Sequence, residues 1–150
     1  MASLVRGLAA ALLVTAIISA CSNAVPSSAL KVGDCVNHTN TTDADGNAID
    51  STVVVACSQA HEEEVFSVFD YPNATSTFPG YEAIGAIEQT QCESDFAGYV
   101  GVTWDQSDAY TINYAGPTEH DWAAGDRAIV CTLDDANGGK LTGPARGTAR

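Results

Sequence analysis

An odd number of cysteines constrains this chain more than any other feature. Four of them, Cys35, Cys57, Cys92 and Cys131, are spread along its length, and the fifth, Cys21, directly follows a short apolar stretch near the N-terminus. An unpaired cysteine in an exported protein requires a separate explanation, because the others are expected to pair. The position of Cys21 supplies one.

Cys21 ends the run Ile18-Ser19-Ala20-Cys21, which is similar to the lipobox of bacterial lipoproteins. Arg6 precedes the almost wholly apolar stretch 7–20, which is shorter than the ~20 apolar residues that a membrane-spanning helix needs. The sequence therefore predicts a signal peptide at 1–20 and lipidation of Cys21. Two acyl chains on Cys21 would hold the protein on the extracytoplasmic side of the cell membrane. A plain secretory signal is the alternative, but it would leave Cys21 as a spare thiol.

The part of the chain after the predicted signal is strongly acidic. Only one of the six basic residues, Arg6, lies in the signal, so five basic residues against 19 acidic ones give the remainder a formal charge of −14. Nucleic acids and anionic lipid surfaces both require clustered Lys and Arg, so neither is an expected partner.

The remainder is expected to be one domain at 30–147, with a flexible tether at 21–29 before it and a short tail at 148–150 after it. A first strand is expected at 30–36, a polar loop at 37–50, and a β-hairpin at 51–71. An amphipathic helix is expected from 81 to about 99, with Glu88 off an apolar stripe of Ile84, Ile87, Cys92, Phe96 and Tyr99. Further strands are expected at 109–114 and 127–133. The order β-β-β-α-β-β predicts an α+β fold, with one helix packed on a small antiparallel sheet.

Four cysteines outside the cytoplasm most simply form two disulfides, with three possible connectivities. Cys92 falls on the apolar stripe of the expected helix, and Cys131 on the apolar side of a strand. This placement favours a Cys92–Cys131 bridge from helix to sheet. Cys35 and Cys57 are then left to join the first strand to the hairpin.

The densest group of ionisable residues is His61 with Glu62, Glu63 and Glu64. Imidazole beside carboxylate can bind a divalent metal or perform acid–base catalysis, so His61 and Glu64 are weak candidate metal ligands. Metal sites, however, need three or four converging ligands, and adjacent strand residues point to opposite faces. We therefore favour a structural histidine beside a solvated acidic edge, with no catalytic residue, metal or cofactor.

Other polar and aromatic residues have a structural and a functional interpretation. Asp34, Asp126 and Arg127 are expected to stabilise turns, with Arg127 bonding either a carboxylate such as Asp34 or backbone carbonyls. Trp104 and Tyr110 are flanked by polar residues and are candidates for an exposed binding surface.

Several short motifs occur in a fixed order along the chain. They are Gly33-Asp34-Cys35, Cys57-x-x-x-His61-x-x-Glu64, Gly125-Asp126-Arg127 and Leu141-x-Gly143-x-x-Arg146-Gly147. Together with the four cysteines, these motifs resemble the septum-formation domain family of actinobacterial exported and membrane proteins. The resemblance implies a cell-envelope role in septum formation and no known catalytic mechanism.

The leading hypothesis is a non-enzymatic, lipid-anchored envelope protein that binds an unidentified envelope or division protein. One alternative is an envelope enzyme or metal-dependent binding module centred on His61 and Glu64. The other is a binder of wall glycan or a small ligand that uses the exposed aromatic residues.

Replacing Cys21 by serine tests the predicted anchor. We expect Cys21→Ser to release the protein from the membrane fraction, because serine cannot carry the thioether-linked lipid and the acidic domain has no affinity of its own for anionic lipid. Fractionation of cells followed by immunoblotting measures this. A variant that stays bound to the membrane would contradict both the anchor and the cysteine assignment.

Overall fold

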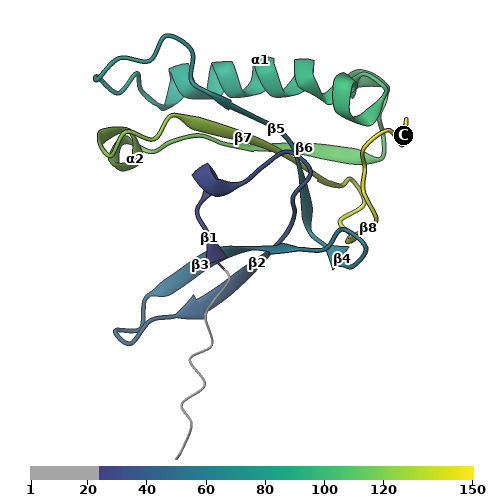
Figure 1. Cartoon of the computed structure of the whole chain (residues 1–150), viewed down its shortest axis with the longest axis horizontal. Coiled ribbons are helices and arrows are strands. Elements are labelled where there is room, and N and C mark those ends of the chain that lie inside the picture. The colour runs from purple at the N-terminus through teal and green to yellow at the C-terminus, as the bar shows by residue number, and fades with distance from the viewer. Residues whose placement is uncertain (1–23) are drawn as a thin grey trace, which may run out of the picture.

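A six-stranded antiparallel sheet is the frame of the fold, and one long helix, α1, covers one of its faces (Figure 1). The computed structural model describes residues 24–150, so the predicted signal peptide and Cys21 lie outside the described residues. The strand order is β1-β3-β2-β5-β7-β6, and a separate two-stranded sheet pairs β4 with β8. The predicted α+β class, with one main helix on an antiparallel sheet, is confirmed.

The bounds of the elements follow the chain in order. The strands are β1 Ala24–Val25, β2 Cys35–Thr42, β3 Ala48–Val55, β4 Ala60–His61, β5 Glu63–Asp70, β6 Tyr110–Ala115, β7 Ala128–Asp135 and β8 Leu141–Thr142. The α-helices are α1 Tyr81–Val100 and α2 Glu119–Ala123, and two short 3-10 helices lie at Ser27–Ala29 and Trp104–Gln106. No helix of residues 24–150 is long and apolar enough to cross a membrane.

The central strands are buried on both faces, and their side chains form two cores. In β7, Cys131 and Leu133 pack under α1, whereas Val130 packs on the opposite side with Val36 and Val65. Strand β5 carries a bulge between Val65 and Ser67. A bulge turns successive side chains to the same face of a sheet, and here Phe66 and Ser67 both contact α1.

Helix α1 presents to the sheet a stripe in which residues recur every three or four positions. Its buried members include Ile84, Glu88, Cys92, Phe96 and Tyr99. The helix ends at Gly101, whose φ of 102° belongs to the left-handed region that favours glycine and whose N–H bonds the carbonyl of Ala97. The predicted stripe is confirmed at Ile84, Cys92, Phe96 and Tyr99, but Ile87 is only half-buried and Glu88, expected elsewhere, is buried. Burial raises the pKa of the Glu88 carboxyl.

Both predicted disulfides are present, which confirms that connectivity. Cys92–Cys131 joins α1 to β7, and both residues are fully buried in the core under the helix. Cys35–Cys57 joins the first residue of β2 to the turn after β3.

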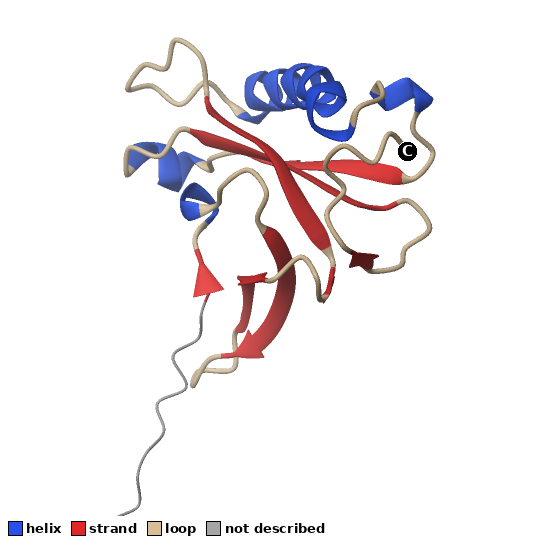
Figure 2. Cartoon of the chain, turned by 45° about the vertical axis from the view of Figure 1, so that its right-hand side comes forward, coloured by secondary structure: helices blue, strands red, loops and turns tan. Residues whose placement is uncertain are grey.

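The prediction for residues 30–71 was wrong in its pairing. Strands β2 and β3 form the hairpin, paired from Cys35↔Val55 to Thr42↔Ala48, while β5 pairs with β2 and β7 instead of β3. The hairpin projects from the domain, so its outer part is exposed on both faces (Figure 2). This exposure explains why the polar residues 37–42 and 48–50, predicted to lie in a loop, form strands.

The segment 24–29 is part of the domain, which corrects the described part of the predicted flexible tether. Ala24 and Val25 pair with Val53 and Thr52 of β3, and Ser27–Ala29 forms a 3-10 helix. Leu30, expected to begin a strand, is buried against Val36 and Val130. At the other end, the predicted tail also belongs to the domain, because Ala149 donates a backbone hydrogen bond to Val100.

Gly116 lets β6 approach α1 closely. A Cβ atom on Gly116 would overlap Glu88 Oε1 and lie 2.7 Å from Ile84 Cγ2. We expect Gly116→Ala to lower the free energy of unfolding by about 1–3 kcal/mol, because the buried side chains of Ile84 and Glu88 must shift to make room. Urea denaturation measures this.

Gly98→Ala is the matched control. Gly98 lies inside α1, is exposed, and would place a Cβ atom in open space. This substitution should raise stability by up to about 1 kcal/mol, since alanine favours the helix. Equal effects of the two substitutions would contradict the close approach at Gly116.

Candidate functional site

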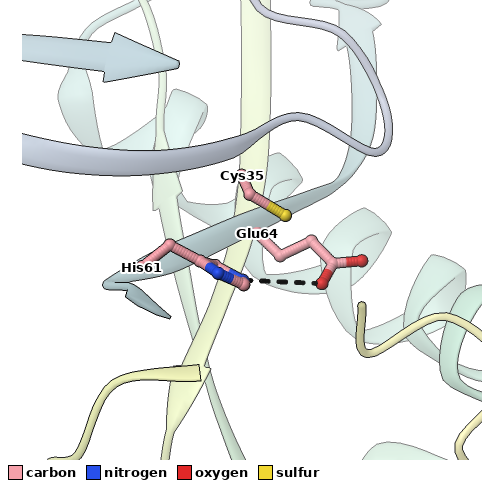
Figure 3. Close-up of side chains that lie close together, drawn as sticks. All are labelled: Cys35, His61 and Glu64. Carbon is pink, nitrogen blue, oxygen red and sulfur yellow. Dashed lines mark ion pairs between the residues drawn. The ribbon is translucent and has the colours of Figure 1, made fainter. Parts of the chain in front are cut away.

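A buried polar cluster lies where β4, β5, α1 and the C-terminal segment meet. We call it the His61–Glu64 cluster; it consists of His61, Glu64, Tyr99 and the adjacent Cys35–Cys57 disulfide. The side chains of His61 and Glu64 are both 0% exposed, and His61 Nε2 lies 4.0 Å from Glu64 Oε2 (Figure 3). The prediction that Glu64 lies on a solvated edge was therefore wrong, although Glu62 and Glu63 are partly exposed.

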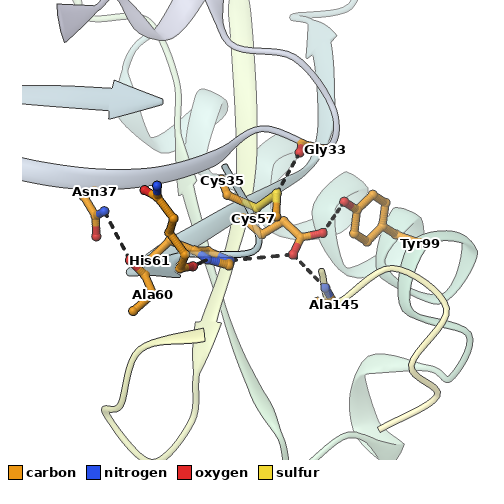
Figure 4. The surroundings of a disulfide bond; sticks show 10 residues. Gly33, Cys35, Asn37, Cys57, Ala60, His61, Tyr99 and Ala145 are labelled. Carbon is orange, nitrogen blue, oxygen red and sulfur yellow. Dashed lines mark hydrogen bonds and ion pairs between the residues drawn. A yellow bond between two sulfur atoms is a disulfide. The ribbon is translucent and has the colours of Figure 1, made fainter. Parts of the chain in front are cut away.

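Glu64 accepts hydrogen bonds from two segments far away in the sequence. The hydroxyl of Tyr99 on α1 donates to Oε1, and the backbone N–H of Ala145 donates to Oε2 at 2.7 Å (Figure 4). Burial raises the pKa of the Tyr99 hydroxyl, and the hydrogen bond to Glu64 raises it further. The guanidinium of Arg146 lies 4.3 Å above the Tyr99 ring, so Glu64 and Arg146 both hold this tyrosine.

His61 is held by one of its two ring nitrogens. Nδ1 lies 2.8 Å from the carbonyl oxygen of Gln59. Because a carbonyl oxygen only accepts hydrogen bonds, Nδ1 carries the proton and is the donor. Nε2 faces Glu64 and has no hydrogen-bond partner within residues 24–150. Cys35 Sγ is the third nearby atom of a ligating type, but the disulfide engages it. In the oxidised protein the cluster thus offers His61 and Glu64 alone, fewer ligands than a metal site needs.

The predicted turn residues Asp34 and Arg127 do not pair with each other. Arg127 donates from Nη1 to the carbonyls of Trp122 (2.7 Å) and Asp126 (2.6 Å), and its guanidinium stacks 3.8 Å above the Trp122 ring. Asp34 is therefore not its partner; Asp34 accepts from the N–H of Lys31 at 2.9 Å. Backbone carbonyls, the other option considered, are the acceptors.

The predicted aromatic surface is wrong, because its residues pack into the core. Tyr110 is 3% exposed, since the first residue of β6 points toward α1. Trp104 is partly buried, with its ring centroid 5.4 Å from that of Phe96. The polar neighbours that suggested exposure lie in the surrounding loop.

A groove on the sheet face opposite α1 was not anticipated from the sequence. Its volume is about 200 Å³. It is lined by residues from the first 3-10 helix and from five strands of the main sheet, β2, β3, β5, β6 and β7. Among them are Leu30, Val36, His38, Glu63, Ala115 and Val130. The nearly continuous apolar run at the start of β7 indicates a strand buried on both faces, but the strands that complete the groove are distant in sequence.

One end of the groove is acidic. His38 Nε2 lies 3.5 Å from Glu63 Oε2 beside the apolar wall. Asp134 follows the lining residue Thr132 on the same face of β7. Burial raises the pKa of Asp134, and the charge of Glu63 raises it further. Asp134 itself does not line the groove, but its carboxyl group lies near the lining residue Glu63, so this end of the groove favours a cationic group.

Comparison with known proteins agrees with the resemblance inferred from the motifs. Residues 32–150 match the model of a family described as septum formation. The chain is 32% identical over 120 residues to the proteins named "Putative lipoprotein LppN" of Mycobacterium tuberculosis and of Mycobacterium bovis. Each match covers 78% of this chain and 62% of the relative, so the chain spans less than two thirds of these curated relatives. No solved structure matches.

Removing the hydroxyl of Tyr99 tests the energetic role of the cluster. We expect Tyr99→Phe to lower the free energy of unfolding by about 1–3 kcal/mol, because a buried carboxylate oxygen of Glu64 loses its donor. The control is Tyr110→Phe, which removes a hydroxyl that pairs with Thr148 Oγ1 at 3.0 Å. Urea denaturation should show the smaller loss for Tyr110→Phe, and the reverse order would contradict this role.

Proposed function

The chain belongs to the septum formation family, and on this premise we propose that it is a lipid-anchored envelope protein that acts in septum formation or cell-wall assembly by binding. The description of the family as septum formation supports a role in that process. The lipobox-like run ending at Cys21, together with relatives that are named lipoproteins, supports an anchor in the cell membrane.

The groove opposite α1 is the observation that supports a binding role. It combines an apolar wall, formed by Leu30, Val36 and Val130, with an acidic end at Glu63, behind which the carboxyl group of Asp134 lies. Its volume of about 200 Å³ is below the ~300–1,000 Å³ that is usual for small-ligand sites. A cavity of this size suits a single anchoring side chain of a partner protein, the kind of contact that dominates interface energy.

The negative charge of the chain favours a partner with basic side chains. With 19 acidic and six basic residues, the chain repels other acidic proteins. At the acidic end of the groove, the carboxylate of Glu63 pairs with His38 and with no lysine or arginine of the described residues. We therefore propose that the partner is an envelope protein segment that inserts a lysine or arginine, flanked by apolar residues, into the groove.

The alternative of an envelope enzyme at His61 and Glu64 has less support. Both side chains are 0% exposed, so a substrate would have to displace Tyr99 and the C-terminal segment to reach them. The groove, in contrast, is open to a partner without rearrangement of the fold.

Filling the groove in the native host tests this proposal. Depletion of the protein should produce abnormal septa, and the wild-type gene should restore them. Ala115→Trp, at an exposed position on the groove, should fail to restore normal septa, because the indole blocks the partner side chain. The matched control Ala86→Trp, at an exposed position on α1 outside the groove, should restore them. Fluorescence microscopy of septa measures both.

The outcomes of this experiment distinguish the role in septum formation from the location of the binding site. Normal septa after depletion would contradict the role in septum formation. Abnormal septa that Ala115→Trp repairs would contradict the groove as the binding site. A Glu63→Gln variant tests the charge independently, because it keeps the shape of the groove. It should weaken cross-linking to the partner by a photoreactive aromatic residue that replaces the exposed lining residue Tyr114.

A further inference from the structure

We propose that the His61–Glu64 cluster becomes a site for a divalent transition metal such as Zn²⁺ when the Cys35–Cys57 disulfide is reduced. The ligands would be the two released thiolates, His61 Nε2 and a carboxylate oxygen of Glu64. Such a set of two cysteines, one histidine and one carboxylate has the number and kind of ligands that four-coordinate zinc uses.

The atoms are already close enough for such a site. Cys35 Sγ, a ring nitrogen of His61 and a carboxylate oxygen of Glu64 all lie within 4.8 Å of one another, and all three residues are buried (Figure 3). Cys57, which is bonded to Cys35, contributes the second sulfur. Around zinc, where Zn–S is about 2.3 Å and Zn–N about 2.0 Å, the two sulfurs would separate by nearly 2 Å once their bond is broken, and the other ligand atoms would approach one another by about 1 Å.

The hydrogen bonds around the cluster resemble those that orient metal ligands. A ligating histidine usually donates its other ring N–H to a carboxylate or a backbone carbonyl. His61 does so through Nδ1, which bonds the carbonyl of Gln59 and leaves the buried Nε2 without a partner within the described chain (Figure 4). Glu64 is likewise fixed, by Tyr99 and by the N–H of Ala145. The first ligands are thus held in place before any metal enters.

The two disulfides differ in their accessibility to a reductant. Cys92 and Cys131 are both fully buried under α1, whereas Cys57 is half-buried in the turn after β3. A dithiol reductant can attack Cys57 Sγ, release Cys35 as a thiolate, and leave as its own disulfide after a second displacement. Two electrons pass to the protein, and the two thiols lose their protons when the metal binds.

Cobalt binding tests the proposal, because thiolate-bound Co²⁺ absorbs through sulfur-to-metal charge transfer. The Cys21→Ser chain, which has no thiol at position 21, is reduced with a phosphine and titrated with Co²⁺ without oxygen. We expect one Co²⁺ per chain with charge-transfer and tetrahedral ligand-field bands, displaced by Zn²⁺, and no such bands without reduction.

Matched variants identify the ligands. His61→Ala should weaken Co²⁺ binding at least about tenfold, whereas His38→Ala, which changes a histidine outside the cluster, should leave the affinity unchanged. The Cys35→Ser/Cys57→Ser double variant should show no charge-transfer band. Charge-transfer bands in that variant would place the sulfur at Cys92 and Cys131 and overturn the proposal. Absence of bands in the reduced parent chain, or loss of its circular dichroism on reduction, would overturn it as well.

Discussion

The fold depends on a narrow junction in its sheet. Only two residue pairs, Cys35↔Glu64 and Val36↔Glu63, connect strands β2 and β5, although β2 pairs with β3 over its whole length. At this junction the Cys35–Cys57 disulfide ties the hairpin to the turn that leads into β4. Glu64 ties the same point to α1 through Tyr99 and to the C-terminal segment through Ala145. Covalent and polar bonds therefore provide the cohesion that a longer ladder would otherwise supply.

The junction also explains why the motifs of this chain are scattered. Gly33 lies beside it with a φ of 97°, in the left-handed region, and its Cα hydrogen faces Arg146 and the Tyr99 hydroxyl. Cys57, His61 and Glu64 approach from one side, and the segment from Gly143 to Arg146 approaches from the other. Gly33 and Arg146, which are 113 positions apart in the sequence (146 − 33), thus serve one location. The spacing of the motifs reflects the paths by which the chain returns to this location.

The sequence was informative where a local period determines which side chains are buried. The spacing along 81–100 predicted α1, and the sidedness of Cys92 and Cys131 predicted their bridge, because both depend on neighbours along the same element. The hairpin of β2 and β3 was not predicted, because its exposed strands carry polar residues on both faces and lack the alternation that indicates a strand. The burial of Glu64 and Tyr110, and the groove itself, depend on segments that meet only in three dimensions.

The pairing of Ala24 and Val25 with β3 has a consequence for motion at a membrane. Only two residues separate Cys21 from Ala24, and an extended chain spans at most about 3.6 Å per residue. A domain anchored at Cys21 would therefore stand within about 10 Å of the bilayer, with its β1 edge turned toward the lipid. Its orientation would be restricted, and its search for a partner would be confined to lateral diffusion in a thin layer. Such confinement raises the local concentration of the groove for partners in the same membrane.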